Sequence, residues 1–335
     1  MAASRRMERS MRQAHPLGKR NERKDNDMSQ LGSTLLIANP QARSGKALRV
    51  AEHLHRRLTS MLSERRTALP ALVFTQRADD ATLIAREHGA NFDTVMTLGG
   101  DGVVHEVVNG LMQLERHDRP QLAVIPYGNG DDFARTLGMD RNPEKALQQI
   151  VEGNAYPMDV GCVNGEWFDE SFSLGLDASI ALGTIELRER TKRTGTVLYV
   201  QAAMDNLLNH FNRHKFKVGF DGVKPQELDA YLIAVQNGRY YGGGFQITPE
   251  ASLEDGVFDV CWASGPFSKP RAAAIFARAK LGRHTGAKGL HFTQARTITI
   301  EVVDEVACQV DGEPLSASRY DIRLEPKALT VIKPR

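Results

Sequence analysis

An alternation of apolar runs and amphipathic segments extends from residue 34 to residue 153, and it constrains the fold more than any other feature of the chain. Each apolar run is followed by a segment with apolar residues at helical spacing, and the last of these segments has a proline near its start and a glycine at its end. Strands that alternate with helices predict a parallel sheet covered by helices on both faces. The runs typical of buried strands are residues 34–40, 71–76, 94–98 and 122–126.

The pattern changes after Gly153. Short β-rich runs separated by Asn-Gly and Asp-Gly turns dominate the rest of the chain, and two helical segments, residues 196–211 and 269–283, interrupt them. Such a pattern predicts an antiparallel domain, either a sandwich or a partial barrel. We therefore expect a fold of the α/β plus all-β class, with a three-layer parallel-sheet domain followed by an antiparallel β-rich domain.

Composition and charge argue against several classes of protein. The chain has 335 residues, of which 41% are hydrophobic and 25% charged, and no run approaches the ~18 apolar residues that a membrane span needs. The three cysteines are widely spaced without a CxxC pair, which argues against a disulfide framework or a thiolate zinc site. The N-terminal segment is broken by charge and lacks the apolar core of a signal peptide. These features predict a cytoplasmic protein.

Positive charge is concentrated at the N-terminus. Residues 1–30 carry eight Lys/Arg and four Asp/Glu, a net charge of +4, whereas the net charge of the whole chain is +2. We expect residues 1–32 to form a basic, disordered extension; the alternative is an arm that touches anionic lipid or nucleic acid. The rest of the chain is not basic enough to predict a nucleic-acid-binding domain, so we expect no nucleic-acid partner.

Three unusual loops follow the predicted parallel strands, at the positions where ligands bind in such sheets. The first, residues 39–46, lacks the GxxxxGK[ST] spacing of a P-loop. The second is the GGDG sequence at residues 99–102, which opens a helix. The third loop, residues 125–139, contains Gly128, Gly130, Asp131 and Asp132.

Loops of this composition suit phosphates and cations. Glycines let backbone N–H groups approach a phosphate, and a helix N-terminus favours negative charge. Asp101 would repel a bare phosphate, but its position makes sense if a divalent cation lies between the two. Taken singly, each loop is also explained as a tight turn or a helix N-cap. Two acidic, glycine-rich loops after successive strands of one sheet favour a phosphate site.

Several motifs stand in a characteristic order along residues 33–335. They are an NP…SGK loop, GGDG with the helix after it, PYGNGDDFARTLG, MDVG, SLGLDA, YYGGGFQITPEASLEDGVFDV and DGE. In this order they resemble the diacylglycerol kinase catalytic-domain family, and they look most similar to its bacterial lipid kinases; sphingosine kinases share the domain.

The resemblance implies an ATP- and Mg²⁺-dependent kinase that phosphorylates the hydroxyl of a diacylglycerol-like or related lipid. It implies a nucleotide-binding domain similar to that of NAD kinases at residues 33–157, onto which residues 321–335 pack back. A β-sandwich domain at residues 158–320 is implied to take the lipid, with ATP bound in the cleft between the two domains.

The resemblance also implies roles for individual residues. Glu313 in DGE matches the proton acceptor for the lipid hydroxyl, and Asp101 matches a second catalytic carboxylate. Thr75 falls where the family has a nucleotide-contacting threonine. The full set implied to bind the nucleotide is Asn39, Thr75, Gly99, Gly100, Asp101, Gly102, Val103, His105, Gly128, Asn129 and Asp132.

Two cation sites are implied. Asp101, Asp132 and Asp159 match an acidic network that organises Mg²⁺ and water in the active site. Asp255, with the backbone carbonyls of Ser252 and Val257, matches a separate structural site; hard oxygen ligands of this kind suit Mg²⁺ or Ca²⁺. Read without the resemblance, Asp255-Gly256 and Asp311-Gly312 are ordinary hairpin turns.

Four residues depart from the family pattern. Val103 and His105 stand where the family usually has Thr and Asn, and Asn129 and Asp131 replace a second Thr and a second Asn. The missing hydroxyls remove two expected phosphate or nucleotide contacts, each worth about 1.5–3 kcal/mol when it reaches a charged group. Asp131 adds negative charge close to where a phosphate or its metal is expected.

Two other functions remain open. An NAD kinase shares GGDG and the fold, and a nucleotide- or lipid-binding protein without catalysis is suggested by the four departures. As partners we expect ATP and a lipid, with peripheral contact to a membrane surface; dimerisation through an exposed edge strand stays open. The membrane contact is predicted for residues 1–24 or for the segment with Arg271, Arg278, Lys280, Arg283 and Lys288.

Overall fold

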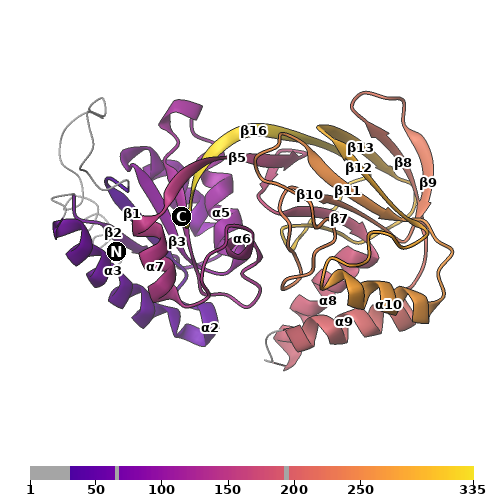
Figure 1. The fold of residues 1–335 in the computed structure, drawn as a ribbon, viewed down its shortest axis with the longest axis horizontal. Coiled ribbons are helices and arrows are strands. Elements are labelled where there is room, and N and C mark those ends of the chain that lie inside the picture. The colour runs from indigo at the N-terminus through magenta and orange to yellow at the C-terminus, as the bar shows by residue number, and fades with distance from the viewer. Residues whose placement is uncertain (1–30, 65–67, 192–195) are drawn as a thin grey trace. The chain divides into compact units, whose positions relative to one another are not determined.

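The computed structural model describes residues 31–64, 68–191 and 196–335. The chain divides into two compact units (Figure 1): the first runs to Met158 and takes up Ala328–Arg335, and the second is Asp159–Lys327. The extension predicted at residues 1–32 lies outside the described residues, apart from Leu31 and Gly32.

The first unit is built on a parallel sheet. Its strands are β1 (Thr34–Ala38), β2 (Ala71–Phe74), β3 (Thr94–Gly99) and β4 (Gln121–Pro126), in the order β2-β1-β3-β4. All residues of β1, β3 and β4 are buried, which explains why these strands read as continuous apolar runs. The chain's last strand, β16 (Arg319–Lys333), adds to the edge by pairing Thr330 and Val331 in parallel with β4.

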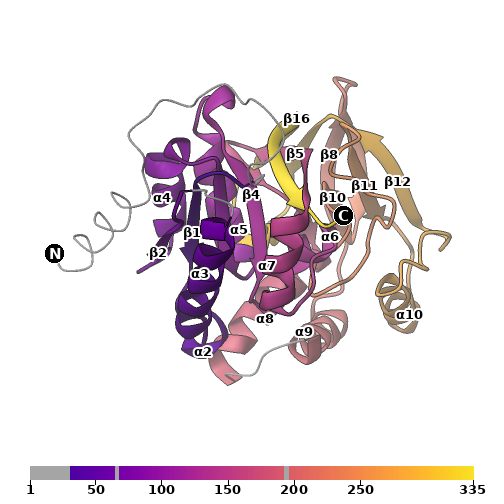
Figure 2. The same ribbon diagram turned by 60° about the vertical axis from the view of Figure 1, so that its left-hand side comes forward.

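Helices cover this sheet. Helix α3 (Ala47–Glu64) contacts β1 and α7 (Pro143–Glu152) contacts β4, and Figures 1 and 2 show the two together on one side of the strands. Helix α4 (Asp80–His88) packs against α5 (Asp101–Met112), which is buried over most of its length. Two short helices, α2 (Ala42–Gly45) and α6 (Asp132–Thr136), lie in the first and third loops.

The backbone of the first loop is kinked. Arg43 and Ser44 both have left-handed backbone, with φ of 49° and 60°, so α2 is separated from α3 by a kink. Non-glycine residues rarely adopt this conformation. The helical segment after β1 is therefore divided into a short helix and a long one.

The second unit is a β-sandwich. One layer continues from the first half of β16 through β13 (Thr297–Val302) and β8 (His214–Phe220) to β9 (Gln226–Ala230), all antiparallel. β5 (Asn154–Val163) pairs with β16 and with β6 (Glu166–Phe168). The other layer has the order β12-β11-β10-β7-β14-β15. Its strands are β7 (Ser171–Gly175), β10 (Leu232–Gln236), β11 (Phe258–Ala263), β12 (Leu290–Ala295), β14 (Cys308–Val310) and β15 (Glu313–Pro314).

Side chains alternate between two cores in this second layer. Val235 and Val260 point into the sandwich, where they join Phe172 of β7 and other buried aromatic residues. Ala234 and Cys261, one residue away, lie in a second apolar cluster with residues of the covering helices. This period-two alternation is what a strand buried on both faces produces. The predicted fold class, a parallel-sheet domain followed by an antiparallel sandwich, is confirmed.

Three helices cover the outer face of the second layer: α8 (Leu176–Thr191), α9 (Thr196–Asn209) and α10 (Lys269–Ala279). Helix α8 was not expected from the sequence, because its apolar residues are spread around the helix axis rather than gathered on one face. Of the helices in the described residues, none is both long enough and apolar enough to cross a membrane.

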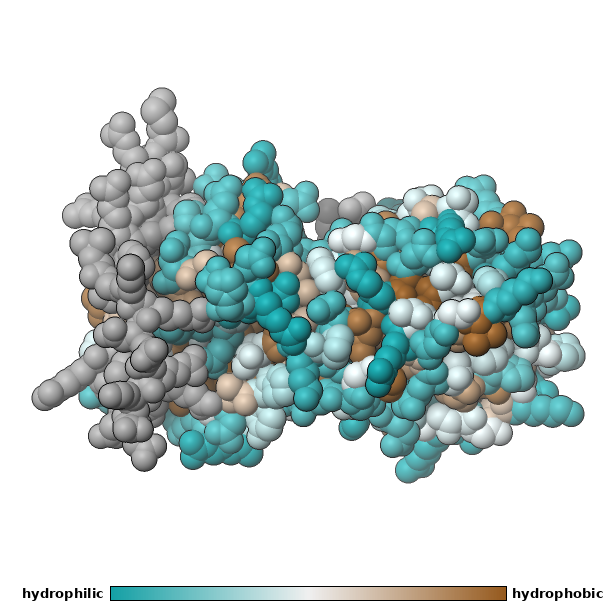
Figure 3. All heavy atoms as spheres, turned by 90° about the horizontal axis from the view of Figure 1, so that it is seen from above, coloured by the Kyte–Doolittle hydropathy of each residue, from teal (hydrophilic) through white to brown (hydrophobic). Residues whose placement is uncertain are grey.

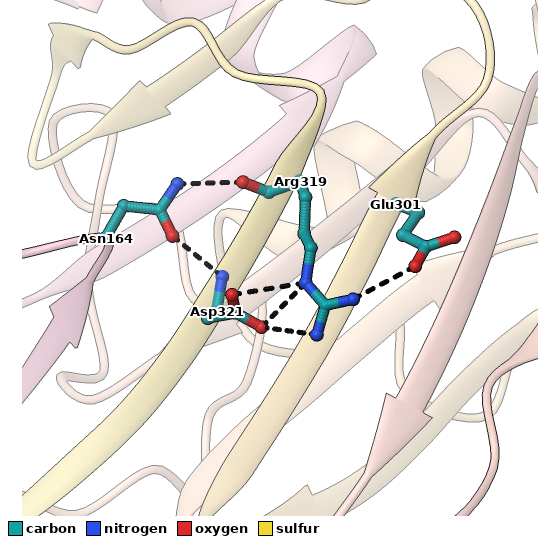
Figure 4. Close-up of polar contacts among 4 residues, drawn as sticks. All are labelled: Asn164, Glu301, Arg319 and Asp321. Carbon is teal, nitrogen blue, oxygen red and sulfur yellow. Dashed lines mark hydrogen bonds and ion pairs between the residues drawn. The ribbon is translucent and has the colours of Figure 1, made fainter.

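The surface of the second unit carries a compact ion-pair network (Figure 4). Arg319 of β16 binds Asp321 through Nη2 at 3.0 Å and Glu301 of β13 through Nη1 at 3.1 Å. Asn164 donates to the Arg319 carbonyl at 2.8 Å and accepts from the Asp321 N–H at 2.9 Å. This network links the β5–β6 turn to β16. The face seen in Figure 3 is largely hydrophilic, with separate apolar groups over the second unit.

Candidate functional site

The two glycine-rich loops of the first unit contact each other through their backbones. β3 and β4 are neighbours, and the Tyr127 N–H donates to the Gly99 carbonyl at 2.7 Å just beyond them. A Cβ built on Gly128 would lie 2.4 Å from the Cα of Gly100, and one on Gly100 would lie 3.1 Å from the Cα of Gly128. Neither glycine can be replaced unless the loops separate, so both are required by close approach.

Asp101 joins the loops through its carboxylate. Its Oδ1 accepts the N–H groups of Asp132 at 2.8 Å and Phe133 at 3.3 Å. A Cβ on Gly130 would lie 2.8 Å from Oδ2 of Asp101 and 3.3 Å from Oδ2 of Asp132, so the two carboxylates converge on this glycine. Burial, followed by the charges of Asp132 and Asp131, raises the pKa of Asp101 to about 8. A cation near these oxygens would relieve the repulsion.

Asp131 is buried beside this pair in left-handed backbone, with φ of 53°. Its Oδ1 accepts the Gly128 N–H at 2.6 Å, and its Oδ2 lies 4.0 Å from Nη2 of Arg43. Burial raises the pKa of Asp131, although the Gly128 N–H and the Arg43 charge oppose the shift.

Arg43 therefore links the first loop to the third. Its Nε donates to the Gly128 carbonyl at 3.1 Å, and its guanidinium carbon lies 4.9 Å from the centroid of the Tyr127 ring. The sequence reasoning did not identify Arg43. The available signal was a basic residue in the first loop together with an unexpected carboxylate, Asp131, in the third.

Most of the expected nucleotide-contacting residues gather at the carboxyl ends of these strands. Asn39 follows β1 and lies beside Gly99, since a Cβ on that glycine would be 3.7 Å from the Asn39 Cβ. Thr75 follows β2, and its N–H donates to the Ala38 carbonyl at 3.0 Å. Val103 is buried against Gly99. This is the edge of a parallel sheet at which ligands bind.

The other expected nucleotide contacts differ in exposure. His105 is buried within α5, with Nε2 at 3.3 Å from the Asn109 side-chain amide. Gly102 is exposed in the first turn of α5, and Asn129 is half-buried. His105 thus lies deeper in the first unit than Gly102 and Asn129 do.

Asp159 belongs to the second unit and is held by backbone groups. Its Oδ1 accepts the Lys327 N–H and its Oδ2 the Gly256 N–H, both at 2.7 Å, and its own N–H donates to Leu253 at 2.7 Å. Asn237 donates its side-chain amide to the carbonyls of Asp159 and Asp169, at 2.9 Å each. Asp159 thus supports the loop of the expected structural cation site, while Asp101 and Asp132 belong to the first unit.

That loop, which contains Ser252, Asp255 and Val257, is acidic. The Asp255 side chain accepts the Val257 N–H at 3.2 Å, and the Ser252 hydroxyl accepts the Glu254 N–H at 3.3 Å. Burial and the charge of Asp159 raise the pKa of Asp255. Oxygen donors with excess negative charge fit a hard divalent cation.

Glu313 is exposed in the two-residue strand β15, opposite Val310 of β14. The turn before it is fixed by Asp311, which has φ of 46° and accepts three N–H groups. These come from Asp169 at 2.9 Å, Glu170 at 3.1 Å and Ser171 at 2.8 Å. From the sequence Asp311 is only a turn residue; in the structure it positions the turn that carries Glu313.

A further carboxyl is buried at the start of α8. Asp177, in the SLGLDA motif, accepts a hydrogen bond from the Tyr241 hydroxyl. Burial raises its pKa to about 6, against the opposing effect of hydrogen bonds from Tyr241 and Ser173. The neighbouring Cys261 thiol also has a raised pKa, because it is buried and lies near this carboxyl. No role for Asp177 is expected from the sequence.

Comparison with known proteins places the chain in a family. The model of the diacylglycerol kinase catalytic domain matches residues 33–163, and that of the YegS C-terminal NAD kinase beta sandwich-like domain matches residues 170–333. A diacylglycerol kinase of Bacillus subtilis is 32% identical over 247 residues, which cover 71% of this chain and 77% of that protein.

Solved structures agree. The crystal structure of a diacylglycerol kinase from Bacillus anthracis is similar with a TM-score of 0.71 and 25% identity, over 91% of this chain and 98% of that one. An NAD kinase from Archaeoglobus fulgidus in complex with ATP has a TM-score of 0.50 and 12% identity, over 90% and 94%, which supports the expected NAD kinase-like fold alone. The chain therefore belongs to the diacylglycerol kinase family.

Proposed function

We propose that this protein is a lipid kinase that transfers the γ-phosphate of ATP to the hydroxyl of a diacylglycerol-like lipid. The observation that carries the proposal is the contact between the GGDG loop and the third loop, in which the Asp101 and Asp132 carboxylates converge on Gly130. Family membership supports the reaction class, since relatives of this chain are named diacylglycerol kinases.

The first unit would bind ATP at the ends of β1, β3 and β4. Gly99 and Gly100 let the backbone approach phosphate oxygens, and the N-terminus of α5 favours negative charge. Asp101 and Asp132 fit Mg²⁺, because this ion prefers carboxylate oxygens and its charge would oppose the burial and the repulsion that raise the pKa of Asp101. Bound there, the ion would neutralise charge on the phosphate oxygens.

Arg43 would offset the departure at Asp131. A carboxylate near the phosphates disfavours ATP, but the Arg43 guanidinium lies 4.0 Å from it and supplies a compensating charge. The chain can therefore keep a nucleotide site although Asp131 stands where the family usually has Asn. The Arg43–Asp131 contact therefore favours an active kinase over a homologue that has lost catalysis.

The second unit would supply the base and the lipid site. In the proposed reaction Glu313 accepts the proton of the lipid hydroxyl. The oxygen of that hydroxyl forms a bond to the γ-phosphorus of ATP, and the bond between this phosphorus and the leaving ADP oxygen breaks. Asp311 acts as a positioning residue for Glu313 through its three backbone hydrogen bonds. A divalent cation at Asp255, with Ser252 and Val257, would have a structural role.

The test is transfer of label from ATP. The purified protein is incubated with γ-labelled ATP and Mg²⁺, separately with diacylglycerol, phosphatidylglycerol, sphingosine and NAD. Label in diacylglycerol supports the proposal, label in another lipid keeps the reaction but changes the acceptor, and label in NAD replaces it with NAD kinase activity. ATP binding without transfer to any acceptor, while a control kinase is active, would overturn it.

A further inference from the structure

Helix α9 presents three large apolar side chains to solvent along one line. Val200, Met204 and Leu208 are 45%, 47% and 57% exposed. They are four residues apart, so each is rotated only about 40° from the previous one around the helix. The buried residues of α9 include Leu198, Ala202, Ala203 and Leu207, of which Ala202 and Ala203 pack against Ala234 and Cys261 of the sheet. Among the described residues of α9, the other exposed ones are Gln201, Asp205 and Asn209, so the apolar stripe has polar residues along one side.

Next to this stripe lies a segment rich in positive charge. From Val260 to Ile300 the chain has seven Lys/Arg and no Asp or Glu. Helix α10 belongs to this segment and contacts α9, and Lys269 at its start donates to the Leu208 carbonyl. Figures 1 and 2 both show α9 and α10 side by side on the same side of the sheet. Arg271 and Arg278 of α10 are exposed.

The exposed arginine of the sandwich surface is different. Arg319 is bound by the carboxylates of Glu301 and Asp321, which cancel its charge (Figure 4). Arg271 instead donates to the Lys288 carbonyl at 2.8 Å and lies over the Phe267 ring, two contacts that leave its charge uncancelled. The segment around α10 therefore has net positive charge beside the apolar stripe.

We propose that the α9–α10 face docks on an anionic phospholipid bilayer. We define this face as Val200, Met204, Leu208, Lys269, Arg271 and Arg278. The apolar side chains enter the boundary between headgroups and acyl chains, while the basic side chains bind lipid phosphates. The choice of a bilayer rests in part on the lipid substrate proposed above. A second copy fits less well, because a symmetric contact through this face would bring two positively charged segments together.

The experiment is flotation of the 335-residue protein with vesicles, without ATP. One set of vesicles is phosphatidylcholine alone, and the other also contains phosphatidylglycerol. We expect binding to the anionic vesicles that weakens as salt is added, and little binding to the neutral ones. The double variant Arg271→Gln with Arg278→Gln should lower the partition coefficient between vesicles and water roughly 25-fold, because each basic residue contributes a factor of roughly five. Met204→Gln with Leu208→Gln should lower it at least about tenfold.

Matched controls come from the same unit. Val223 and Val303 are 61% and 60% exposed but lie outside α9 and α10, so Val223→Gln with Val303→Gln should leave vesicle binding unchanged. Arg319→Gln removes one positive charge that is already paired, and it should also bind as the unchanged protein does. Circular dichroism and thermal melting of each variant show that it is folded.

Three results would overturn the docking proposal. The protein fails to bind anionic vesicles; the α9 and α10 variants bind as well as the controls, which would assign binding to another part of the chain; or sedimentation shows a dimer that the α9 variant abolishes. The two proposals remain distinguishable through activity on lipid in detergent micelles. Activity without vesicle binding removes only the docking surface, and vesicle binding without activity removes only the kinase.

Discussion

Two sets of carboxylates, one in each unit, have opposite electrostatic surroundings. Around Gly130 in the first unit, Asp101 and Asp132 converge, and burial together with the charges of Asp132 and Asp131 raises the pKa of Asp101 to about 8. In the second unit Asp311 accepts three backbone N–H groups, and Asp159 accepts two. The first arrangement is electrostatically unfavourable until a cation binds, whereas the second is already stabilised by the fold. The Asp101–Asp132 pair thus has the features of a cation-binding site, whereas Asp311 and Asp159 hold the backbone around them in place.

The largest effect is expected for Glu313, the proposed base on the turn that Asp311 fixes. Glu313→Gln keeps the size of the side chain but cannot accept a proton, so kcat should fall roughly 10³-fold while the KM for ATP and the melting temperature are unchanged. Steady-state kinetics with the lipid acceptor measure this. Glu305→Gln, an exposed change in the same unit, is the control. Retention of normal turnover by Glu313→Gln would remove it as the base.

Asp311→Ala removes the carboxylate that fixes this turn. It leaves the N–H groups of residues 169–171 without their acceptor, and we expect a loss of about 4 kcal/mol in the free energy of unfolding. Denaturant unfolding measures the loss. Asp321→Ala, which removes an exposed carboxylate of the surface network, should cost less than about 1 kcal/mol. Equal losses for the two variants would contradict the role assigned to Asp311.

Asp101→Asn should have the opposite signature. The amide can still accept the Asp132 N–H, but it lacks the charge that a cation needs, so kcat/KM for Mg-ATP should fall roughly 100-fold. Because repulsion with Asp132 disappears, the free energy of unfolding at pH 8 should stay the same or rise. Kinetics at several Mg²⁺ concentrations and thermal melting give the two readouts, with Glu115→Gln as an exposed control. An unchanged metal dependence would contradict the role of Asp101.

Some contacts of the candidate site could be predicted from the sequence and others could not. The GGDG loop and the third loop follow successive strands of a parallel sheet, so their meeting was predictable from order and strand type alone. The Arg43–Asp131 contact was not, because it depends on left-handed backbone at Arg43 and Ser44 in a loop without a glycine at those positions.

The hydrogen bonds of Asp311 and Asp159 in the second unit could not be predicted from the sequence either. Asp311 and Asp159 act through backbone N–H groups distant in sequence, from residues 169–171, 256 and 327. Their local sequences indicate only a turn and the middle of a strand, so no spacing rule reveals these partners. Helix α8 was missed for a different reason, because its sequence carries no amphipathic signal.

Asp177 offers a carboxyl whose behaviour should follow pH. Its pKa of about 6 in the folded protein exceeds the ordinary value of 3.8, so the folded state holds the proton more firmly than the unfolded chain. Stability is therefore full below about pH 4 and falls as the pH rises through about 6. The shift sets an upper limit of about 3 kcal/mol, and relaxation around the charged form is expected to reduce the change to about 2 kcal/mol.

Asp177→Asn should remove this fall in stability between pH 4 and pH 7, because the amide keeps an acceptor for Tyr241 and never ionises. Denaturant unfolding at several pH values tests it. Glu186→Gln, an exposed change in α8, should retain the full pH dependence of the unchanged protein. If the Asn variant keeps that dependence, another group is responsible.

The smallest effect is expected for Arg43 and Asp131, whose charges offset each other in the first unit. Arg43→Gln alone leaves the Asp131 charge unbalanced and should weaken ATP binding about fivefold, whereas Asp131→Asn in the same chain should restore it. The coupling should be no more than about 1 kcal/mol, because Arg43 is partly exposed and 4.0 Å from Asp131, and it should shrink at high salt. Calorimetric ATP affinities of the four proteins of the cycle, at low and high salt, measure it. Strictly additive losses would mean that Arg43 acts on the nucleotide directly, and the unusual Asp131 would then be tolerated without compensation from the first loop.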